Sequence, residues 1–240
     1  MIQKIKTFLK NASPIFLMDL YRSFRKKKKL DIDGLSTEEV FSKIYKEKYW
    51  VYGESVSGTG SDVNQTNVII PELERLFHEL EVTSILDAPC GDFNWMNQVN
   101  LDGINYLGID IVEDLIRFNR SKYWNKRGVK FKTGDIITGD LPRVDLILCR
   151  DCLVHFSFAD IKKTLVNFKK SGSKYLLATS FFDRNSNTDI PTGYWRPLNL
   201  QKPPFNFPPP IKIINEKCME GGGKHRDKML LAWELKNLNI

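Results

Sequence analysis

The stretch LDAPCGDFNW, residues 86–95, ends an apolar run and enters a turn with a single central glycine, Gly91. Turns that bind a dinucleotide carry several glycines, because the backbone must approach the pyrophosphate closely. Here two acidic residues, Asp87 and Asp92, flank the turn instead. Negative side chains oppose a pyrophosphate at such a turn. We therefore predict a nucleotide-type loop whose ligand is cationic or zwitterionic.

Length and composition indicate one soluble globular domain with an ordinary core. The chain has 240 residues, of which 42% are hydrophobic and 27% charged. It contains no apolar run of membrane-spanning length and no signal-peptide pattern, so we expect a cytoplasmic location. The one CxxC pair, Cys149 and Cys152, has no second pair at zinc-site spacing. We expect reduced thiols and no metal site.

The positive charge is concentrated at the N-terminus. Residues 1–34 hold nine Lys or Arg against three Asp, a net +6 of the total +7. The remaining chain is close to neutral, so we expect no nucleic-acid partner. Apolar residues from Ile2 to Phe24 recur at helical spacing, which predicts a helical extension over residues 1–50 before a main domain at 51–240. We favour packing of this basic arm on its own domain over a weak association with an anionic membrane surface.

From Thr83 onward, short apolar segments alternate with helical patterns. Predicted strands cover residues 84–89, 105–111, 129–136, 144–151, 173–181, 211–216 and 227–235. Predicted helices cover residues 36–50, 67–81, 93–100, 112–124 and 157–171. The first of these helices opens with a capping box of Ser36 and Glu39, and the second contains Pro71, where a bend is expected. The alternation predicts an α/β fold with a mostly parallel seven-stranded sheet flanked by helices.

Acidic residues follow the first three strands of the alternating region. Asp87 ends the first strand, Asp110 follows 23 positions later at the end of the second, and Asp135 ends the third. The segment CRDCLVH follows the fourth strand. Ligands of open parallel sheets bind beyond the carboxyl ends of the strands, so these residues are expected at one site. Asp110 suits the two hydroxyl groups of a ribose.

The order and spacing of these strand ends resemble class I S-adenosylmethionine-dependent methyltransferases, over residues 83–180 and through the final strands to about 235. The resemblance implies a Rossmann-like methyltransferase fold and S-adenosylmethionine as the cofactor. The first loop departs from the family pattern at Pro89 and Phe93, where glycine is usual. The resemblance implies cofactor contacts from Asp87, Pro89, Gly91, Asp92 and Phe93 in the first loop, from Asp110 and Ile111 at the ribose, from Asp135 and Ile136 at the adenine, and from Arg150. A cofactor without a pyrophosphate needs only one central glycine.

The acceptor side offers a histidine. The turn after the fourth strand lacks the Pro-Pro-aromatic pattern of amino-methylating enzymes and the Pro-Cys pair of cytosine-C5 enzymes. It contains His155, whose imidazole, with a pKa near neutrality, can accept a proton from a hydroxyl group. We therefore predict His155 as the general base, with Asp151 as a second catalytic candidate. The alternative for His155 is a purely structural histidine in a helix cap.

Two weaker patterns surround this candidate site. Asp151 together with Asp183 and Asn185 forms a broken version of the magnesium ligands of catechol-type O-methyltransferases, a minority hypothesis. The segment 53–62, rich in glycine and serine, is either a binding loop preceding the first strand or a surface loop.

The proline-rich segment 192–210 is the expected wall of the acceptor site. Its aromatic residues Tyr194, Trp195, Phe205 and Phe207 suit a sugar or another ring, unless the segment is a stiff loop that buries them. His225 and Arg226 follow in a glycine-rich turn that can meet an anion or form a plain hairpin loop.

These patterns together favour methyl transfer from S-adenosylmethionine to an oxygen of a small-molecule or glycan acceptor, with a sugar hydroxyl of a glycan or glycan precursor as the preferred acceptor. The proline-rich segment is similar to bacterial methyltransferases found among surface-polysaccharide enzymes. Three alternatives stay open: an RNA or protein methyltransferase anchored by the basic arm, a noncatalytic S-adenosylmethionine-binding partner subunit, and a nicotinamide dehydrogenase, against which the single glycine counts.

Overall fold

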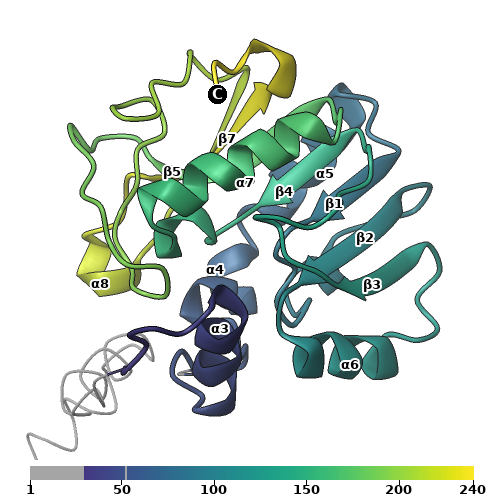
Figure 1. Ribbon diagram of the computed structural model, residues 1–240. Helices are drawn as coiled ribbons and strands as arrows, with labels where there is room; N and C mark the ends of the chain where they lie inside the picture. Colours follow the sequence, from purple (N-terminus) through teal and green to yellow (C-terminus); the bar gives the residue numbers. More distant parts are fainter. Residues whose placement is uncertain (1–29, 52) are drawn as a thin grey trace, which may run out of the picture.

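The computed structural model describes residues 30–51 and 53–240, and the helical pattern expected before residue 30 lies outside them. Seven strands form one sheet in the order β3-β2-β1-β4-β5-β7-β6 (Figure 1). The strands are β1 (Ser84–Asp87), β2 (Asn105–Asp110), β3 (Val129–Thr133), β4 (Leu146–Cys149), β5 (Tyr175–Phe181), β6 (Lys212–Asn215) and β7 (Lys228–Glu234). The helices are α3 (Thr37–Lys46), α4 (Val63–Thr66), α5 (Ile70–Glu79), α6 (Glu113–Lys122), α7 (Phe158–Lys170) and α8 (Glu220–Gly223).

The sheet is mixed, with a parallel majority. β1 pairs in parallel with β2 and β4, β2 with β3, and β4 with β5. β7 is antiparallel to both β5 and β6. The prediction of a mostly parallel seven-stranded sheet is confirmed. In the register, Asp87 lies beside Gly108 of β2 and Leu148 of β4, so the carboxyl ends of the central strands meet at one edge.

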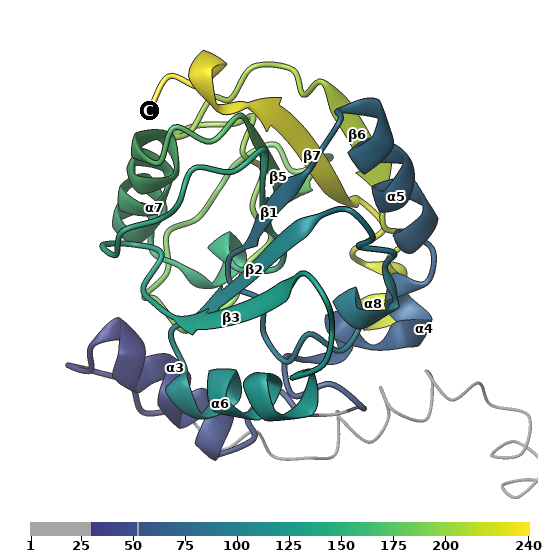
Figure 2. The same cartoon turned by 90° about the vertical axis from the view of Figure 1, so that its right-hand side faces the viewer.

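Helices cover both faces of the sheet. α7 lies on one face and α5 on the other, as the two perpendicular views show (Figures 1 and 2). Alternate strand residues point to opposite faces. Leu86 of β1 therefore belongs to the core beneath α7, with Leu165, whereas Ile85 belongs to the core beneath α5, with Leu73.

The described part of the predicted N-terminal extension packs onto the domain. α3 begins at the predicted capping box, in which Ser36 accepts from the Glu39 backbone and the Glu39 carboxylate accepts from Ser36. The buried face of α3 forms a small cluster with Leu30, Ile32 and Trp50. At Gly193, a Cβ would lie 2.5 Å from a methyl group of Val40. The segment between β5 and β6 therefore approaches α3 so closely that there is no room for a side chain at this position. The predicted boundary at residue 50 thus runs through a packed part of the structure.

Two predicted helices differ in the structure. Residues 93–100 form no α-helix but a short 3-10 turn, Met96–Gln98. Phe93 takes φ +57°, a left-handed conformation that interrupts regular helix there. The predicted helix at 67–81 is shorter in the structure, where α5 covers Ile70–Glu79 and the separate helix α4 ends before it. Pro71 lies in the first turn of α5, where its missing N–H costs no hydrogen bond. It starts a helix rather than bending one.

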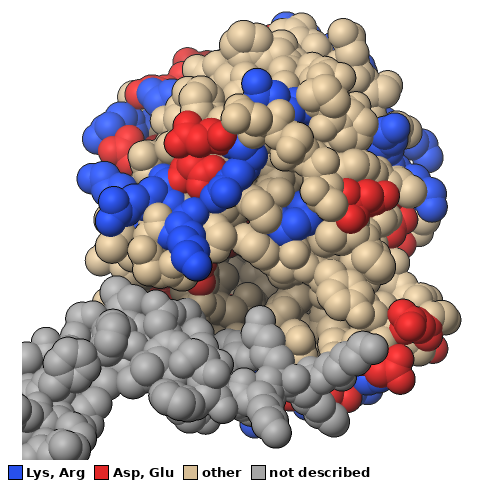
Figure 3. Space-filling view, turned by 90° about the vertical axis from the view of Figure 1, so that its left-hand side faces the viewer, with Lys and Arg blue, Asp and Glu red and all other residues tan. Residues whose placement is uncertain are grey.

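The surface of the described residues carries both signs of charge. On the face drawn in Figure 3, lysines and arginines are interspersed with acidic residues around a broad uncharged area. Within the described part of the chain, no helix has the length and apolarity needed to cross a bilayer.

Candidate functional site

A cavity lies at the carboxyl ends of the parallel strands, where α3 and the loop after it close one side. It has about 1070 Å³ of space not filled by protein, part of it open to solvent. The lining includes Thr37, Phe41, Ile44, Tyr45 and Trp50; Val56, Ser57 and Ser61; Asp87, Pro89, Cys90, Gly91, Asp92 and Trp95; Asp110, Ile111, Val112 and Leu115; Gly134, Asp135 and Ile136; and Arg150, Asp151, Cys152, His155 and Phe156. The structure therefore brings together the predicted site residues from all four strand ends, with the exception of Phe93.

Asp87 ends β1 as a nearly buried carboxyl group at the cavity wall, with 3% of its surface exposed. Tyr106 of β2 donates its hydroxyl to Asp87 Oδ2 at 2.5 Å. Burial raises the pKa of Asp87 to about 7, although the Tyr106 hydrogen bond opposes that rise. An ionised Asp87 therefore gains from a positive charge in the cavity.

The loop after β1 is held against the segment that precedes the first strand. Asp92 accepts hydrogen bonds from Ser55 Oγ and from the backbone N–H of Val56, both at 2.9 Å to Oδ2. Ser57 Oγ accepts from the Asp92 backbone at 3.2 Å. Asp92 lines the cavity, but its carboxylate anchors residues 55–57 over the first loop. Of the two alternatives for residues 53–62, a binding loop or a surface loop, the lining of the cavity by Val56, Ser57 and Ser61 favours the binding loop.

Asp110 ends β2 and supports the same loop. Its Oδ2 accepts from the Gly91 backbone at 3.2 Å and its Oδ1 from the Val112 backbone at 3.0 Å. Burial raises the pKa of Asp110 to about 6, against the effect of these backbone donors. Each carboxylate oxygen keeps a second lone pair for a ligand hydroxyl.

Apolar side chains near Asp110 form part of the cavity lining, which we call the apolar floor. Ile111, Val112 and Leu115 line the cavity together with Ile136 from the turn after β3. Asp135 also lines it, yet its carboxylate is engaged locally: Oδ1 accepts from the Ile137 backbone at 2.8 Å and Oδ2 from Thr138 Oγ1 at 2.6 Å. Ile136 is thus placed as expected for a contact with a flat ring, and Asp135 mainly fixes the turn that presents it.

Phe93 does not line the cavity, contrary to the expectation of a cofactor contact. Its ring is 1% exposed and packs at 5.0–5.2 Å from the rings of Tyr106, Tyr123 and Phe131. An aromatic side chain two residues after the central glycine gains more from this core than from the cavity, because full burial removes its entire apolar surface from water. Phe93 therefore anchors the loop after β1 to the core.

His155 lies in the 3-10 turn Leu153–His155, at the end of β4, and lines the cavity. Its Nδ1 lies 2.9 Å from the backbone oxygen of Tyr194. A carbonyl oxygen only accepts, so Nδ1 carries the hydrogen and Nε2 carries a lone pair. The imidazole packs on Trp50, with ring centroids 4.5 Å apart. Burial lowers the pKa of His155 to about 4, so the ring is neutral at physiological pH, and the expected value near neutrality is corrected downward.

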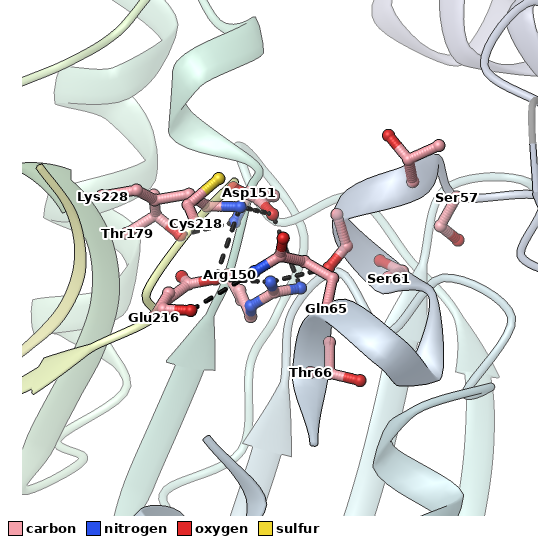
Figure 4. Close-up of polar contacts among 12 residues, drawn as sticks. Ser57, Ser61, Gln65, Thr66, Arg150, Asp151, Thr179, Glu216, Cys218 and Lys228 are labelled. Carbon is pink, nitrogen blue, oxygen red and sulfur yellow. Dashed lines mark hydrogen bonds and ion pairs between the residues drawn. The ribbon is translucent and has the colours of Figure 1, made fainter. Parts of the chain in front are cut away.

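Arg150 and Asp151 belong to an ionic network that links β4 to the last strands (Figure 4). Arg150 donates to Glu216 Oε2 at 2.5 Å and to the Gly60 backbone oxygen at 2.7 Å. Lys228 donates to Asp151 Oδ2 at 2.6 Å. The side chains of Arg150, Lys228 and Glu216 are 3%, 3% and 0% exposed, and that of Asp151 is 26% exposed. Asp151 and Arg150 both line the cavity, and Asp151 is the more exposed of the two.

The network holds Asp151 ionised. Burial by itself would raise the pKa of Asp151, but Lys228 and Arg150 lower it to about 2. Asp151 also has φ +53°, a conformation that non-glycine residues adopt at a cost, and Thr179 Oγ1 accepts from its backbone N–H at 2.8 Å. The guanidinium of Arg150 donates to Glu216 and Gly60, and Arg150 lines the cavity, so its cofactor contact stays a prediction.

The magnesium hypothesis finds no support in the geometry. The partners of Asp151 are the cations Lys228 and Arg150. Asp183 and Asn185 are exposed. Among residues 30–51 and 53–240, no three His, Cys, Asp or Glu residues are grouped so that they could hold a metal ion.

The proline-rich segment is split between surface and core. Phe205 and Phe207 are 7% and 6% exposed and pack in the core, which corrects their predicted place in an acceptor wall. Tyr194 and Trp195 are 39% and 45% exposed. Trp195 contacts the ring of His225 at 5.0 Å, outside the cavity lining. The aromatic wall of the cavity comes from another part of the chain.

Sequence reasoning missed that wall and the partners of Asp151. Phe41 lies 6.0 Å from Trp50 and 5.8 Å from Phe156, ring centroid to ring centroid, and all three residues line the cavity. Their pattern in the sequence is that of an ordinary amphipathic helix and turn. Lys228 begins β7 directly after Asp227, and Glu216 follows β6 directly before Lys217, so in the sequence both look like ordinary charged residues at strand ends.

Comparisons with known proteins show the fold. No family model matches the sequence, and no curated protein matches it. A structure from work on the conversion of a disulfide bond into a thioacetal group during echinomycin biosynthesis has a TM-score of 0.55 and 15% identity, over 83% of this chain and 92% of that one. The PH0226 protein from Pyrococcus horikoshii OT3 has a TM-score of 0.53 and 16% identity, over 71% and 89%. Magnesium protoporphyrin IX methyltransferase (ChlM) from Synechocystis PCC 6803, with bound SAM, has a TM-score of 0.48 and 15% identity, over 65% and 82%. These likenesses, all at 15–16% identity, show a shared fold.

Proposed function

We propose that this protein transfers a methyl group from S-adenosylmethionine to an oxygen acceptor. The observation that carries the proposal is the pair of buried carboxyl groups, Asp87 and Asp110, at the ends of neighbouring strands beside the apolar floor at Ile136. A zwitterionic nucleoside needs an acid for its ammonium group, acceptors for its ribose hydroxyls and an apolar surface for its base. The cavity supplies these in that order along the strand ends.

The cavity residues fit the cofactor. Asp87 would hold the ammonium group, Asp110 the ribose hydroxyls, and Ile111, Leu115 and Ile136 the adenine ring. Gly91 takes φ +53° and leaves its surface free of a side chain where Ser57 approaches. When bound, S-adenosylmethionine supplies a sulfonium methyl group, whose C–S bond breaks with its electron pair left on sulfur as the acceptor oxygen forms the new O–C bond.

His155 acts as the general base in this proposal. Its Nδ1–H donates to the Tyr194 carbonyl oxygen, so the lone pair of Nε2 is available to accept a proton. Nε2 accepts the proton of the acceptor hydroxyl and later releases it to solvent. Trp50 packs on the ring of His155, and Phe41 packs on Trp50 in turn. The protein's part is orientation and the removal of one proton.

The preferred acceptor is a sugar hydroxyl of a glycan or glycan precursor. Trp50 packs on the proposed base and Tyr45 lines the same cavity, and aromatic faces suit a pyranose ring as well as an aromatic one. A cytoplasmic location and a weak membrane contact of the N-terminal arm remain predictions from the sequence.

Calorimetry with S-adenosylmethionine, followed by assays with a tritiated methyl donor, tests the proposal. We expect binding in the micromolar range and transfer to glycans or glycan precursors. Binding without turnover on any acceptor would favour a noncatalytic partner subunit. Transfer to RNA or protein instead, with a steep salt dependence lost on deletion of residues 1–34, would favour an enzyme anchored by its basic arm. No detectable binding would contradict the proposal.

A further inference from the structure

Asp151 presents one unengaged carboxylate oxygen at the cavity. Lys228 Nζ at 2.6 Å and Arg150 NH1 at 3.5 Å both contact Oδ2. No hydrogen-bond donor of the described residues contacts Oδ1. The Asp151 side chain is 26% exposed and lines the cavity, whereas the side chains of its two cationic partners are each 3% exposed. Oδ1 is therefore a free acceptor on the cavity wall.

His155 presents a second free acceptor on the same wall. Nδ1 is occupied by the Tyr194 carbonyl, and Nε2 has no partner within the described part of the chain. The two residues stand four positions apart, and the 3-10 turn Leu153–His155 connects them. Charge attraction between Asp151 and the ring is one of the influences on the pKa of His155, as expected for neighbouring groups.

We propose that the acceptor offers two neighbouring hydroxyl groups, one bound by Asp151 Oδ1 and the other, which is methylated, bound by His155 Nε2. This inference rests on the proposed function and names the acceptor class of that same site. The class is a diol, and a sugar with adjacent free hydroxyls is its preferred source.

The chemistry of the two atoms limits the acceptor. A carboxylate oxygen and an unprotonated imidazole nitrogen both accept hydrogen bonds and donate none. An acceptor with a carboxylate or phosphate at this place would meet the negative charge of Asp151. A single hydroxyl satisfies one atom and leaves the other without a partner, a loss that lowers kcat/KM strongly where a site is built to bind an O–H group.

The ionic network gives Asp151 a defined orientation before a ligand arrives. Oδ2 is held by Lys228, and the backbone N–H by Thr179, so the direction of Oδ1 does not depend on the acceptor. Preorganised acceptors of this kind bind a substrate at a lower cost in conformational entropy. Asp151 is thus a binding residue for the hydroxyl next to the methylated one.

Paired acceptors test the proposal with the unaltered protein. We would compare methyl glycosides with their monodeoxy counterparts, cis-1,2-cyclohexanediol with cyclohexanol, and catechol with phenol, each with tritiated-methyl S-adenosylmethionine. The diol of a reactive pair should exceed its monohydroxy partner at least tenfold in kcat/KM. The glycoside pairs identify a sugar source and the catechol pair an aromatic one.

A variant links the preference to the residue. Asp151→Asn should reduce the diol preference below about threefold while the Kd of S-adenosylmethionine stays within about threefold of the native value. If this variant does not fold, the comparison of diol and monohydroxy acceptors with the native protein is the test of the proposal. Equal kcat/KM within the reactive pairs, or no transfer to any diol by a protein that binds S-adenosylmethionine, would overturn the diol proposal alone. A failure to bind S-adenosylmethionine would contradict the proposed function as well.

Discussion

Ser57 and Gly91 approach so closely that a side chain cannot stand between them. An ideal Cβ placed on Gly91 would lie 2.3 Å from Ser57 Oγ and 3.1 Å from Ser57 Cβ. Gly91 also has φ +53°, which favours glycine. The single glycine of the first loop is therefore required by a neighbouring segment of this chain as well as by its own backbone conformation.

Gly91→Ala should weaken S-adenosylmethionine binding at least tenfold and lower the free energy of unfolding. The added methyl group displaces Ser57 and with it the contact of residues 55–57 to Asp92. Strain from a non-glycine residue at positive φ adds about 1 kcal/mol or more. Calorimetry measures the first effect and urea denaturation the second.

Gly103→Ala is the matched control. Gly103 has φ +77°, and a Cβ there meets no atom within 4 Å, so only the backbone strain applies. We expect a similar loss from strain and unchanged cofactor affinity. Equal affinities in the two variants would show that the contact between Ser57 and Gly91 has no role in binding.

Asp110→Ala should weaken S-adenosylmethionine binding about ten- to a hundredfold. A hydrogen bond to a charged group contributes roughly 1.5–3 kcal/mol, and Asp110 also holds the Gly91 backbone. Calorimetry on the folded variant measures the loss. If the variant bound S-adenosylmethionine with native affinity, the assignment of Asp110 to the ribose and the proposed cofactor would both be contradicted.

The contribution of Asp87 and Asp110 to the stability of the ligand-free protein should fall as the pH rises from about 4 to 7, and the lowered pKa of His155 opposes part of that fall. Burial raises the pKa of Asp87 to about 7 and that of Asp110 to about 6, both above their values in the unfolded chain. Groups with raised native pKa values stabilise the fold below the unfolded pKa and lose that contribution as the pH passes the folded pKa. Urea denaturation at stepped pH measures this fall.

S-adenosylmethionine should reduce that fall, because its ammonium group favours ionised Asp87. Tyr106→Phe should move the midpoint of the affinity–pH curve upward, since the Tyr106 hydrogen bond lowers the pKa of Asp87. An affinity independent of pH between 5 and 8 would contradict the placement of the ammonium group at Asp87.

His155→Gln should slow turnover roughly a hundredfold while cofactor affinity stays within about twofold. In the native enzyme saturated with S-adenosylmethionine, the rate should fall only as the pH drops through about 4, because a neutral imidazole accepts the proton and burial lowers the pKa of His155 to that value. A fall near neutrality, or the same midpoint in the variant, would assign the ionisation to another group. Near-native turnover of the variant would exclude His155 as the base.

Glu216→Leu should lower the free energy of unfolding by about 3–5 kcal/mol. Glu216 is fully buried between Arg150 and Lys228, and its loss leaves two buried cations with Asp151 as their remaining acidic neighbour in the network. Lys236→Ala, at an exposed pair with Glu234, should change stability by less than about 0.5–1 kcal/mol. Urea denaturation measures the free energy of unfolding of both variants. A loss for Glu216→Leu as small as that for Lys236→Ala would show that the buried network is not needed for folding.

Most of the fold follows from local patterns. The capping box at Ser36, the alternation from Thr83 and the seven apolar strand segments give the correct elements, because each depends on residues close in sequence. The helix expected at 93–100 fails because Phe93 is drawn into the aromatic core by Tyr106 and Phe131, which lie farther along the chain. A prediction from neighbouring residues alone does not include contacts with residues so far along the chain.

The candidate site is predictable only on its strand-end side. The lining by Asp87, Asp110 and His155 follows from the rule that strand ends of a parallel sheet converge. The opposite side, with Phe41 and Trp50, depends on how α3 docks, which is set by contacts such as that of Val40 with Gly193. Phe205 and Phe207 resemble exposed loop aromatics in the sequence, and only the tertiary packing shows that they are buried.

The pairing of β1 with β4 also sets an order of folding. Ile85 and Leu146 are neighbours in the sheet although 61 positions separate them in the chain, whereas helices such as α6 and α7 need only local contacts. Loop-closure entropy must be overcome before such a distant pairing contributes, so it forms late. Because the cavity has walls on both strands and on α3, it exists only after that step. In refolding experiments, the recovery of ligand binding should lag behind the recovery of helical circular dichroism, and fragments that end before β4 should refold without a binding site.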